Sequence, residues 1–197
     1  MIKIHATKKL FAKLPIDEQG YLPADKPIAA NDEFVHTAET PSLLSGWHAN
    51  VVTLQRRNCV LFVHDTTRFA LLLIGLTKPD FAKLDALFQD VLMNTLLKCG
   101  ANNEQMQAAV MQLQHLCFDT QCDRSVQGSL NRMKADLEHL LWYDNTEVME
   151  LSAYRTSVWL SERPSMLKGM KSSECLWPIK AMAALLGKGE FDTPSLM

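Results

Sequence analysis

Hydrophobic and polar positions alternate near the amino terminus and again in the first half of the chain, which predicts β-strands. Ile2-Lys3-Ile4-His5 alternates as a half-buried strand does. Three apolar runs between residues 47 and 74 are separated by the polar turns Arg56-Arg57-Asn58 and Asp65-Thr66-Thr67. Two tight connections at this spacing predict an antiparallel three-stranded meander. The middle run, residues 59–64, is apolar on both faces, so we expect an interior strand.

From residue 79 onward, apolar residues recur at the 3.6-residue spacing of amphipathic helices. Capping residues, prolines and glycines at the ends of these segments mark where the helices begin and end. The expected helices run from Pro79 to Gly100, from Asn102 or Asn103 to Leu113, from Asp123 or Ser125 to Leu141, and from Pro178 to Gly187. Residues 146–161 carry mixed signals: their apolar spacing favours a helix, whereas the run from Thr156 to Leu160 also suits an extended segment.

Together these elements predict an α+β fold in one domain. A small antiparallel sheet, made of the amino-terminal strand and the meander at 47–74, is covered by helices from 79 onward. The chain of 197 residues has the usual size of a single domain, so we expect one domain over 1–197. Residues 15–46 contain several prolines and show neither the strand nor the helix spacing of apolar residues, which predicts a long irregular loop. The chain from about residue 188 is expected to be a loose tail.

Composition predicts a soluble globular protein. Apolar residues make up 47% of the chain and charged residues 21%, close to the average of such proteins. The longest apolar runs fall far short of the roughly 20 residues that cross a bilayer, so no membrane partner is expected. The first residues lack the apolar stretch of a secretory signal, which favours a cytoplasmic location.

Cysteine and histidine spacing argues against a bound metal. The five cysteines include no C-x-x-C pair, and the six histidines form no H-x-H or H-x-x-x-H pair. No phosphate-binding glycine loop is present either. We therefore expect reduced thiols, no metal and no cofactor. The net charge of −2 gives the chain no general attraction to nucleic acid.

The first candidate for chemistry is His64-Asp65 together with Arg68. A histidine where a buried strand meets solvent, with a carboxylate and a guanidinium nearby, can serve as a general base or bind an anion. The alternative is an ordinary hairpin turn with a solvated arginine. Adjacent strand residues point to opposite faces, so His64 and Asp65 act on one substrate atom only if the turn redirects Asp65.

The second candidate is the start of the helix near residue 124. Arg124, Ser125, Gly128 and Asn131 offer an arginine, a hydroxyl, a small residue and an amide at the positively polarised end of a helix, which favours anion binding. The alternative is simple capping, with a glycine that allows another element to pack closely.

The third candidate is the Arg56-Arg57 pair, with Trp47 and His48 upstream. Arginines at a hairpin tip can contact phosphates, and a nearby aromatic ring can stack on a base. The alternative is a solvated turn and a core tryptophan. Arg56-Arg57 and His64-Asp65 stand at opposite ends of a strand, roughly 17 to 20 Å apart. At most one end belongs to a compact site, and we favour the end nearer Arg124.

Three function classes follow from these candidates. The first is a non-enzymatic binding or regulatory module with an anion-friendly site, whose partner is an anionic ligand or a protein. The second is a nucleic-acid-binding protein that uses the basic end of the sheet at Arg56 and Arg57. The third is a metal-independent enzyme that uses His64, Asp65 and Arg124. The clear patterns are those of a core rather than of a catalytic constellation, which favours the first class.

The chain also resembles a family of uncharacterised bacterial proteins known as a domain of unknown function. The segments that carry the resemblance are HATKKL at 5–10, GWHANVVTLQRRNCVLFVHDTTRF at 46–69, FDTQCDRSVQGSLNRMKADLEHLL at 118–141, LSERP at 160–164 and LWPIKAM at 176–182. The resemblance implies a bacterial origin and one continuous domain. It implies no activity, cofactor or catalytic residue.

Overall fold

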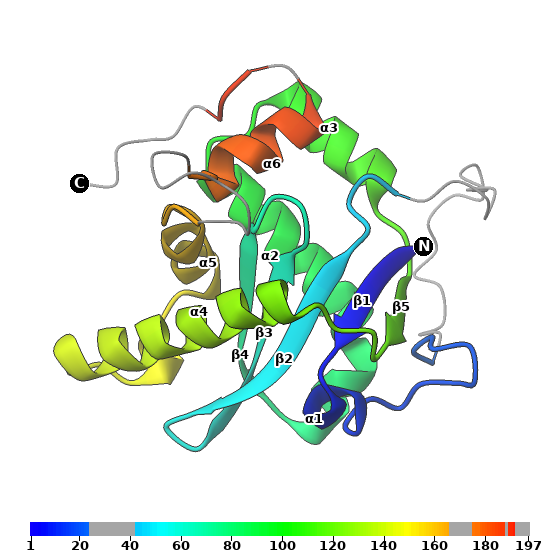
Figure 1. Cartoon of the computed structure of the whole chain (residues 1–197), viewed down its shortest axis with the longest axis vertical. Coiled ribbons are helices and arrows are strands. Elements are labelled where there is room, and N and C mark those ends of the chain that lie inside the picture. The colour runs from blue at the N-terminus through cyan, green and yellow to red at the C-terminus, as the bar shows by residue number, and fades with distance from the viewer. Residues whose placement is uncertain (24–41, 166–174, 188, 192–197) are drawn as a thin grey trace.

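A five-stranded sheet forms the centre of the molecule in a computed structural model that describes residues 1–23, 42–165, 175–187 and 189–191 (Figure 1). Residues 24–41 of the expected loop and 192–197 of the expected tail lie outside the described residues. The order of strands is β4-β3-β2-β1-β5. The strands are β1 (Ile2–Ala6), β2 (Trp47–Leu54), β3 (Arg57–His64), β4 (Ala70–Leu76) and β5 (Leu116–Asp119).

The sheet is mixed, so the prediction of an antiparallel sheet is wrong in one part. Strands β2, β3 and β4 form the expected antiparallel meander. Strand β1, however, pairs in parallel with β2 on one side and with β5 on the other. Parallel neighbours need a crossover of a dozen residues or more, and residues 7–46 supply one between β1 and β2. The periodicity of a strand carries no information on the direction of its neighbours.

The helices agree with the predicted segments, which confirms the α+β class. The helix expected from Pro79 begins as a 3₁₀ turn and continues as an α-helix. Residues 146–161 contain a 3₁₀ turn followed by an α-helix. The helical elements are α1 (Lys8–Phe11), η1 (Lys78–Lys83), α2 (Leu84–Lys98), α3 (Asn103–Gln112), α4 (Arg124–Tyr143), η2 (Val148–Glu150), α5 (Ala153–Ser161) and α6 (Pro178–Leu186).

Helices cover both faces of the sheet, with α4 in front and α2 behind in Figure 1. On the α2 side, Phe88 packs edge-on against the rings of Trp47 and Phe62, at 5.2 and 5.3 Å between ring centroids. On the α4 side, Leu130 and Leu137 share a separate buried cluster with apolar residues of β2, β3 and β4. The interior strand β3 is therefore buried on both faces, as expected.

Two serines of α5 close the β4 edge of the sheet. The amide of Ala70 donates to Ser161 Oγ and the amide of Leu72 donates to Ser157 Oγ, each at 2.9 Å. The two serines are four residues apart on a helix, which corresponds to a rise of about 6 Å, and the two amides are two residues apart on a strand, which corresponds to about 6.6 Å. Each serine can therefore lie beside one amide. The serine hydroxyls thus stand in for a neighbouring strand and block edge-to-edge pairing at these amides.

Replacing both edge serines with alanine tests this interpretation. The variant Ser157→Ala/Ser161→Ala leaves the buried amides of Ala70 and Leu72 without acceptors, and each such loss costs about 1–3 kcal/mol. We expect the free energy of unfolding, measured by urea denaturation, to fall by at least about 2 kcal/mol. Ser129→Ala, on the partly exposed surface of α4, is the control and should change it by less than about 0.5 kcal/mol. A double variant as stable as the control would contradict the assignment.

Candidate functional site

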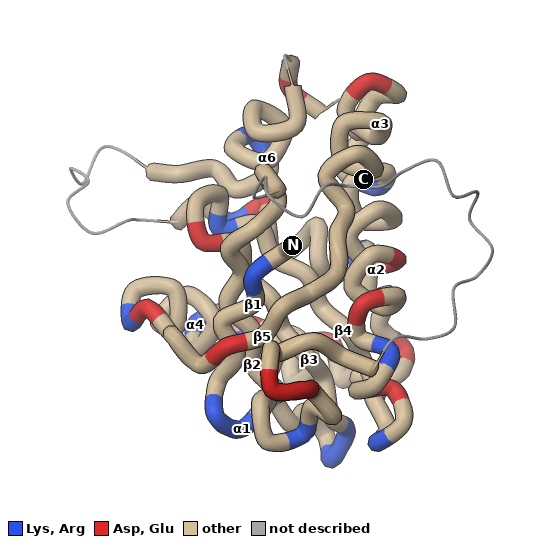
Figure 2. The backbone as a smooth tube through the Cα atoms, turned by 90° about the vertical axis from the view of Figure 1, so that its right-hand side faces the viewer, with Lys and Arg blue, Asp and Glu red and all other residues tan. Residues whose placement is uncertain are grey.

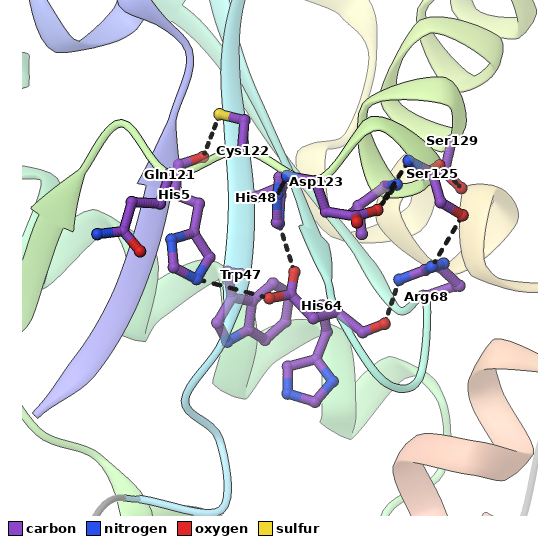
Figure 3. A network of polar contacts seen from close by, with 12 residues as sticks. His5, Trp47, His48, His64, Arg68, Gln121, Cys122, Asp123, Ser125 and Ser129 are labelled. Atoms are coloured by element: carbon purple, nitrogen blue, oxygen red, sulfur yellow. Dashed lines mark hydrogen bonds and ion pairs between the residues drawn. The ribbon is translucent and has the colours of Figure 1, made fainter.

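The parallel register of three strands places three polar side chains in one row. His5 of β1 lies opposite His48 of β2 and opposite Asp119 of β5. Paired residues of neighbouring strands point to the same face, and here it is the face on which α4 packs against β2 and β3. Figure 3 shows His5 and His48 side by side close to the start of α4. The row lies at the margin of the core.

Asp65 joins the two histidines of this row. Its Oδ1 accepts a hydrogen bond from His48 Nδ1 at 2.6 Å, and its Oδ2 lies 3.8 Å from His5 Nε2. Asp65 is the first residue after β3, where its amide donates to the carbonyl of Gly46 at 2.8 Å. The turn therefore directs Asp65 toward the α4 face.

His48 is held at both ring nitrogens. The amide of Asp123 donates to Nε2 at 2.6 Å, so the ring proton resides on Nδ1 and is donated to Asp65. The residue is 2% exposed. With both nitrogens occupied, His48 has no free lone pair for proton transfer. Its contacts instead tie the end of β3 and the start of α4 to β2.

His5 continues the row toward the edge of the sheet. Its Nδ1 lies 2.7 Å from Asp119 Oδ1, an oxygen that also accepts from the amide of Gln121. The thiol of Cys122 donates to the His5 carbonyl at 3.6 Å. The His5 side chain is 18% exposed, so this member of the row reaches solvent. The row therefore runs from the surface at His5 to the interior at His48.

His64 is separate from this row, because it points into the core. Its Nδ1 lies 2.9 Å from Thr67 Oγ1, and its ring packs edge-on against Trp47 at 4.9 Å between centroids. Burial lowers the pKa of His64 to about 4, so the ring is neutral at pH 7. At 1% exposure it has no access to a ligand from solvent. His64 and Asp65 therefore do not converge on one atom.

Arg68 brings a positive charge beneath the start of α4. It is 6% exposed and has a left-handed backbone, with φ of 59°. One terminal nitrogen donates to the carbonyl of Asp65, and Nη2 lies 3.5 Å from Ser125 Oγ. Burial lowers the pKa of Arg68, while the charges of Asp65 and Asp123 raise it. The acceptors of this guanidinium are a carbonyl and a hydroxyl, and its buried Nε has no partner among the described residues.

The amides at the start of α4 are already used by Asp123. Its Oδ1 accepts from the amide of Ser125 at 2.7 Å and from that of Val126 at 3.2 Å. These two bonds lower the pKa of the Asp123 carboxyl. The positively polarised helix end that favoured anion binding is therefore already occupied by a carboxylate. Any ligand here must instead be held by side chains.

A cleft of about 490 Å³ lies along α4 beside Ser125. Of the predicted residues, Ser125 and Gly128 line it, whereas Arg124 and Asn131 do not. A Cβ built on Gly128 meets nothing within 4 Å, so this glycine is not required for close packing of another element. The lining consists of Ser125, Gly128, Ser129, Arg132, Met133, Asp136, Leu160, Arg163, Pro164 and Ser165.

Sequence reasoning missed Arg132 and Arg163 in this cleft. Arg132 lies two turns after Ser125 on the same side of the helix, a spacing that a helical projection can show. Arg163 comes from the segment after α5, and no local pattern links it to α4. It is fixed there by Asp136, whose Oδ1 lies 2.9 Å from Arg163 Nη1. Only tertiary packing identifies this residue.

Arg56 and Arg57 lie far from this cleft, at the other end of β3. Arg56 is in the turn of the β2–β3 hairpin, with φ of 66°. Trp47, the ring expected beside them, is 0% exposed and packs in the core. In Figure 2 the Lys and Arg positions at the α1 end of the molecule are interspersed with Asp and Glu. The structure therefore does not bring Trp47 and the arginine pair together.

The described residues offer no group of three or more histidine, cysteine or carboxylate side chains placed to hold a metal ion. Among the helices in that same part of the chain, none is both long and apolar enough to span a membrane.

The pH dependence of stability tests the burial of His64. Its pKa is about 4 in the folded protein against 6.5 when unperturbed. As the pH falls from 6.5 to 4, the unfolded chain binds a proton that the folded protein does not, so the free energy of unfolding falls. We expect the titration of His64 to lower the free energy of unfolding, measured by urea denaturation, by about 2–3 kcal/mol between pH 7 and pH 4. His64→Asn should show a correspondingly smaller decrease, and equal decreases would disprove the assignment.

A family model covers most of the chain. The matching family is DUF6933, a domain of unknown function, and the match spans residues 3–181. Searches of curated proteins and of solved structures found no significant match. The match agrees with the expectation of a domain family of unknown function, and it extends from Lys3 in β1 to Ala181 in α6. The chain therefore belongs to the DUF6933 family of domains of unknown function.

Proposed function

We propose that the protein is a binding module that holds a small organic molecule with a phosphate or carboxylate group in the cleft beside Ser125. The observation that carries this proposal is the contact between the buried guanidinium of Arg68 and the hydroxyl of Ser125, at 3.5 Å. A buried polar group without a full set of partners costs free energy, and such groups mark functional sites in many proteins.

This contact also directs the Ser125 hydroxyl. A hydroxyl has one hydrogen to donate and can accept from other donors. Because the Arg68 guanidinium can only donate, Ser125 Oγ is the acceptor, and its own hydrogen is free to point into the cleft. The buried charge behind the hydroxyl favours a negatively charged acceptor. Ser125 is therefore suited to donate to an anionic oxygen.

Arg132 and Arg163 supply further donors from two sides of the cleft. Asp136 Oδ1 lies 2.9 Å from Arg163 Nη1, and the guanidinium carbon lies 4.0 Å from the ring centroid of Trp159. A guanidinium held in this way loses little conformational entropy when it binds a phosphate or carboxylate. These contacts support recognition of an anionic group.

The cleft is also partly apolar, which favours an organic ligand over a bare ion. Met133, Leu160 and Pro164 contribute apolar surface beside the arginines. Its volume of about 490 Å³ is within the range of small-molecule sites. An anionic head and an apolar body are the features that such a lining recognises.

Two of the histidines in this region are poorly placed for acid–base catalysis. His48 uses both nitrogens in structural bonds, and His64 is buried. His64 points into the core and Asp65 points toward His48, which argues against an acid–base role that needs both on one substrate atom. The described cysteines are free thiols, which suits a reducing compartment, and the bacterial cytoplasm is the location that we propose.

Phenyl phosphate is a suitable probe, because it combines a phosphate with an apolar ring. We expect it to bind more tightly than inorganic phosphate or phenol in heteronuclear NMR titrations at constant ionic strength. Arg132→Ala and Arg163→Ala should each weaken its binding roughly tenfold, since a charge-assisted hydrogen bond contributes about 1.5 kcal/mol or more.

Arg124→Ala is the matched control, because Arg124 lies on the same helix but outside the cleft. It should leave the affinity within about twofold of the native protein. Weaker binding in Arg124→Ala together with unchanged binding in Arg132→Ala would contradict the proposed cleft and place the site at the start of the helix. No chemical-shift change at the residues of the cleft with any of the three probes would refute the proposal.

A further inference from the structure

A second cleft lies at the carboxyl end of α4, beyond the residues that line the first. It has a volume of about 550 Å³ and runs between this helix end and the β2–β3 hairpin. The lining residues are Thr53, Leu54, Gln55, Glu138, Leu141, Trp142, Asn145, Thr146 and Glu147. None of them belongs to the proposed anion site, so the two clefts are separate.

Aromatic rings are exposed at this cleft. Trp142 is 77% exposed and Tyr143 is 74% exposed, although large aromatic side chains usually gain most from burial. His139 lies 6.0 Å from each of these rings between centroids and is stacked parallel to Tyr143. Three rings thus stand together on the surface of one helical turn. An exposed group of this kind is typical of an interaction site.

The charge around these rings is negative. Two charged residues line the cleft, and both are carboxylates. They are Glu147 and Glu138, and Glu138 Oε1 lies 3.0 Å from Lys134 Nζ on the same helix. The last turn of α4 contains no basic residue to balance the partial negative charge of the helix end. The face of an indole ring adds further negative potential, and it attracts cations more strongly than other aromatic side chains do. These features together complement a positively charged group.

The walls of the cleft are fixed before any partner arrives. Gln55 Nε2 donates to the carbonyl of Thr146 at 3.0 Å, and Gln55 Oε1 accepts from the amide of Val148 at 2.7 Å. The Thr146 hydroxyl donates to Glu150 at 2.8 Å. These bonds hold the hairpin against the chain that follows α4. A preformed cleft reduces the entropic cost of binding.

We propose that this cleft binds a basic peptide segment of a partner protein, with a Lys or Arg side chain seated against Trp142 beside Glu147. A peptide fits better than a small amine, because His139 and Tyr143 extend the aromatic surface beyond the cleft itself. Arg56 and Arg57 follow Gln55 on the hairpin but do not line the cleft. They belong to the surface that nucleic acid would contact under the competing interpretation.

Fluorescence anisotropy with a labelled nonapeptide of alternating Arg and Gly tests the proposal on the full chain. We expect saturable binding that weakens as salt rises. A peptide of the same length with Glu in place of Arg should not bind. Trp142→Ala should weaken binding of the Arg peptide roughly tenfold, and Glu147→Gln should weaken it by a smaller factor. Both changes are at exposed positions, so the fold should be retained.

Glu104→Gln is the matched control for loss of one negative charge, because Glu104 is an exposed residue of α3 outside the cleft. It should bind the Arg peptide as the native chain does. Equal affinity of Trp142→Ala and the native chain would overturn the proposal. It would also be overturned if a labelled single-stranded oligonucleotide bound more tightly than the Arg peptide and lost affinity in Arg56→Ala/Arg57→Ala. That result would assign the surface to nucleic acid.

Discussion

The imidazole of His48 connects the three parts of the molecule that define its polar surface. One nitrogen donates to Asp65 at the end of β3, and the other accepts from the amide of Asp123 at the start of α4. Because the ring is buried, losing either bond would leave an unpaired polar group in the interior. The position of α4 across the sheet therefore depends on this residue, and both clefts lie along α4.

Three charged side chains at the start of α4, those of Asp123, Asp65 and Arg68, cap the helix, orient His48 and contact Ser125. Asp123 caps the helix, and Asp65 orients His48 while its carbonyl accepts from Arg68. Arg68 then reaches the hydroxyl of Ser125 from below. The carboxylates here are engaged by amides and an imidazole, so they neutralise the buried guanidinium only at a distance. A positive charge remains close to the cleft, which is the electrostatic basis of the proposed anion site.

Much of the fold follows from local patterns. Alternation identified β1 and the meander, and the helical period together with caps such as Asp123 identified α4 and its neighbours. The direction of β1 did not follow, because the same alternation suits a parallel or an antiparallel neighbour. That direction matters for the candidate site, since only the parallel register sets His5 beside His48 and Asp119. The presence of β5 at the far edge likewise depends on pairing with β1.

By itself the sequence determined strands β1 to β4, the helices that follow them and the α+β class, because these depend on neighbours within a few positions. It also separated Arg56 from His64, since a strand has a fixed length. Only the tertiary structure decided that His64 faces the core, that Asp65 faces His48, and that Arg163 joins α4. These outcomes depend on contacts between residues far apart in the chain, which no local period records.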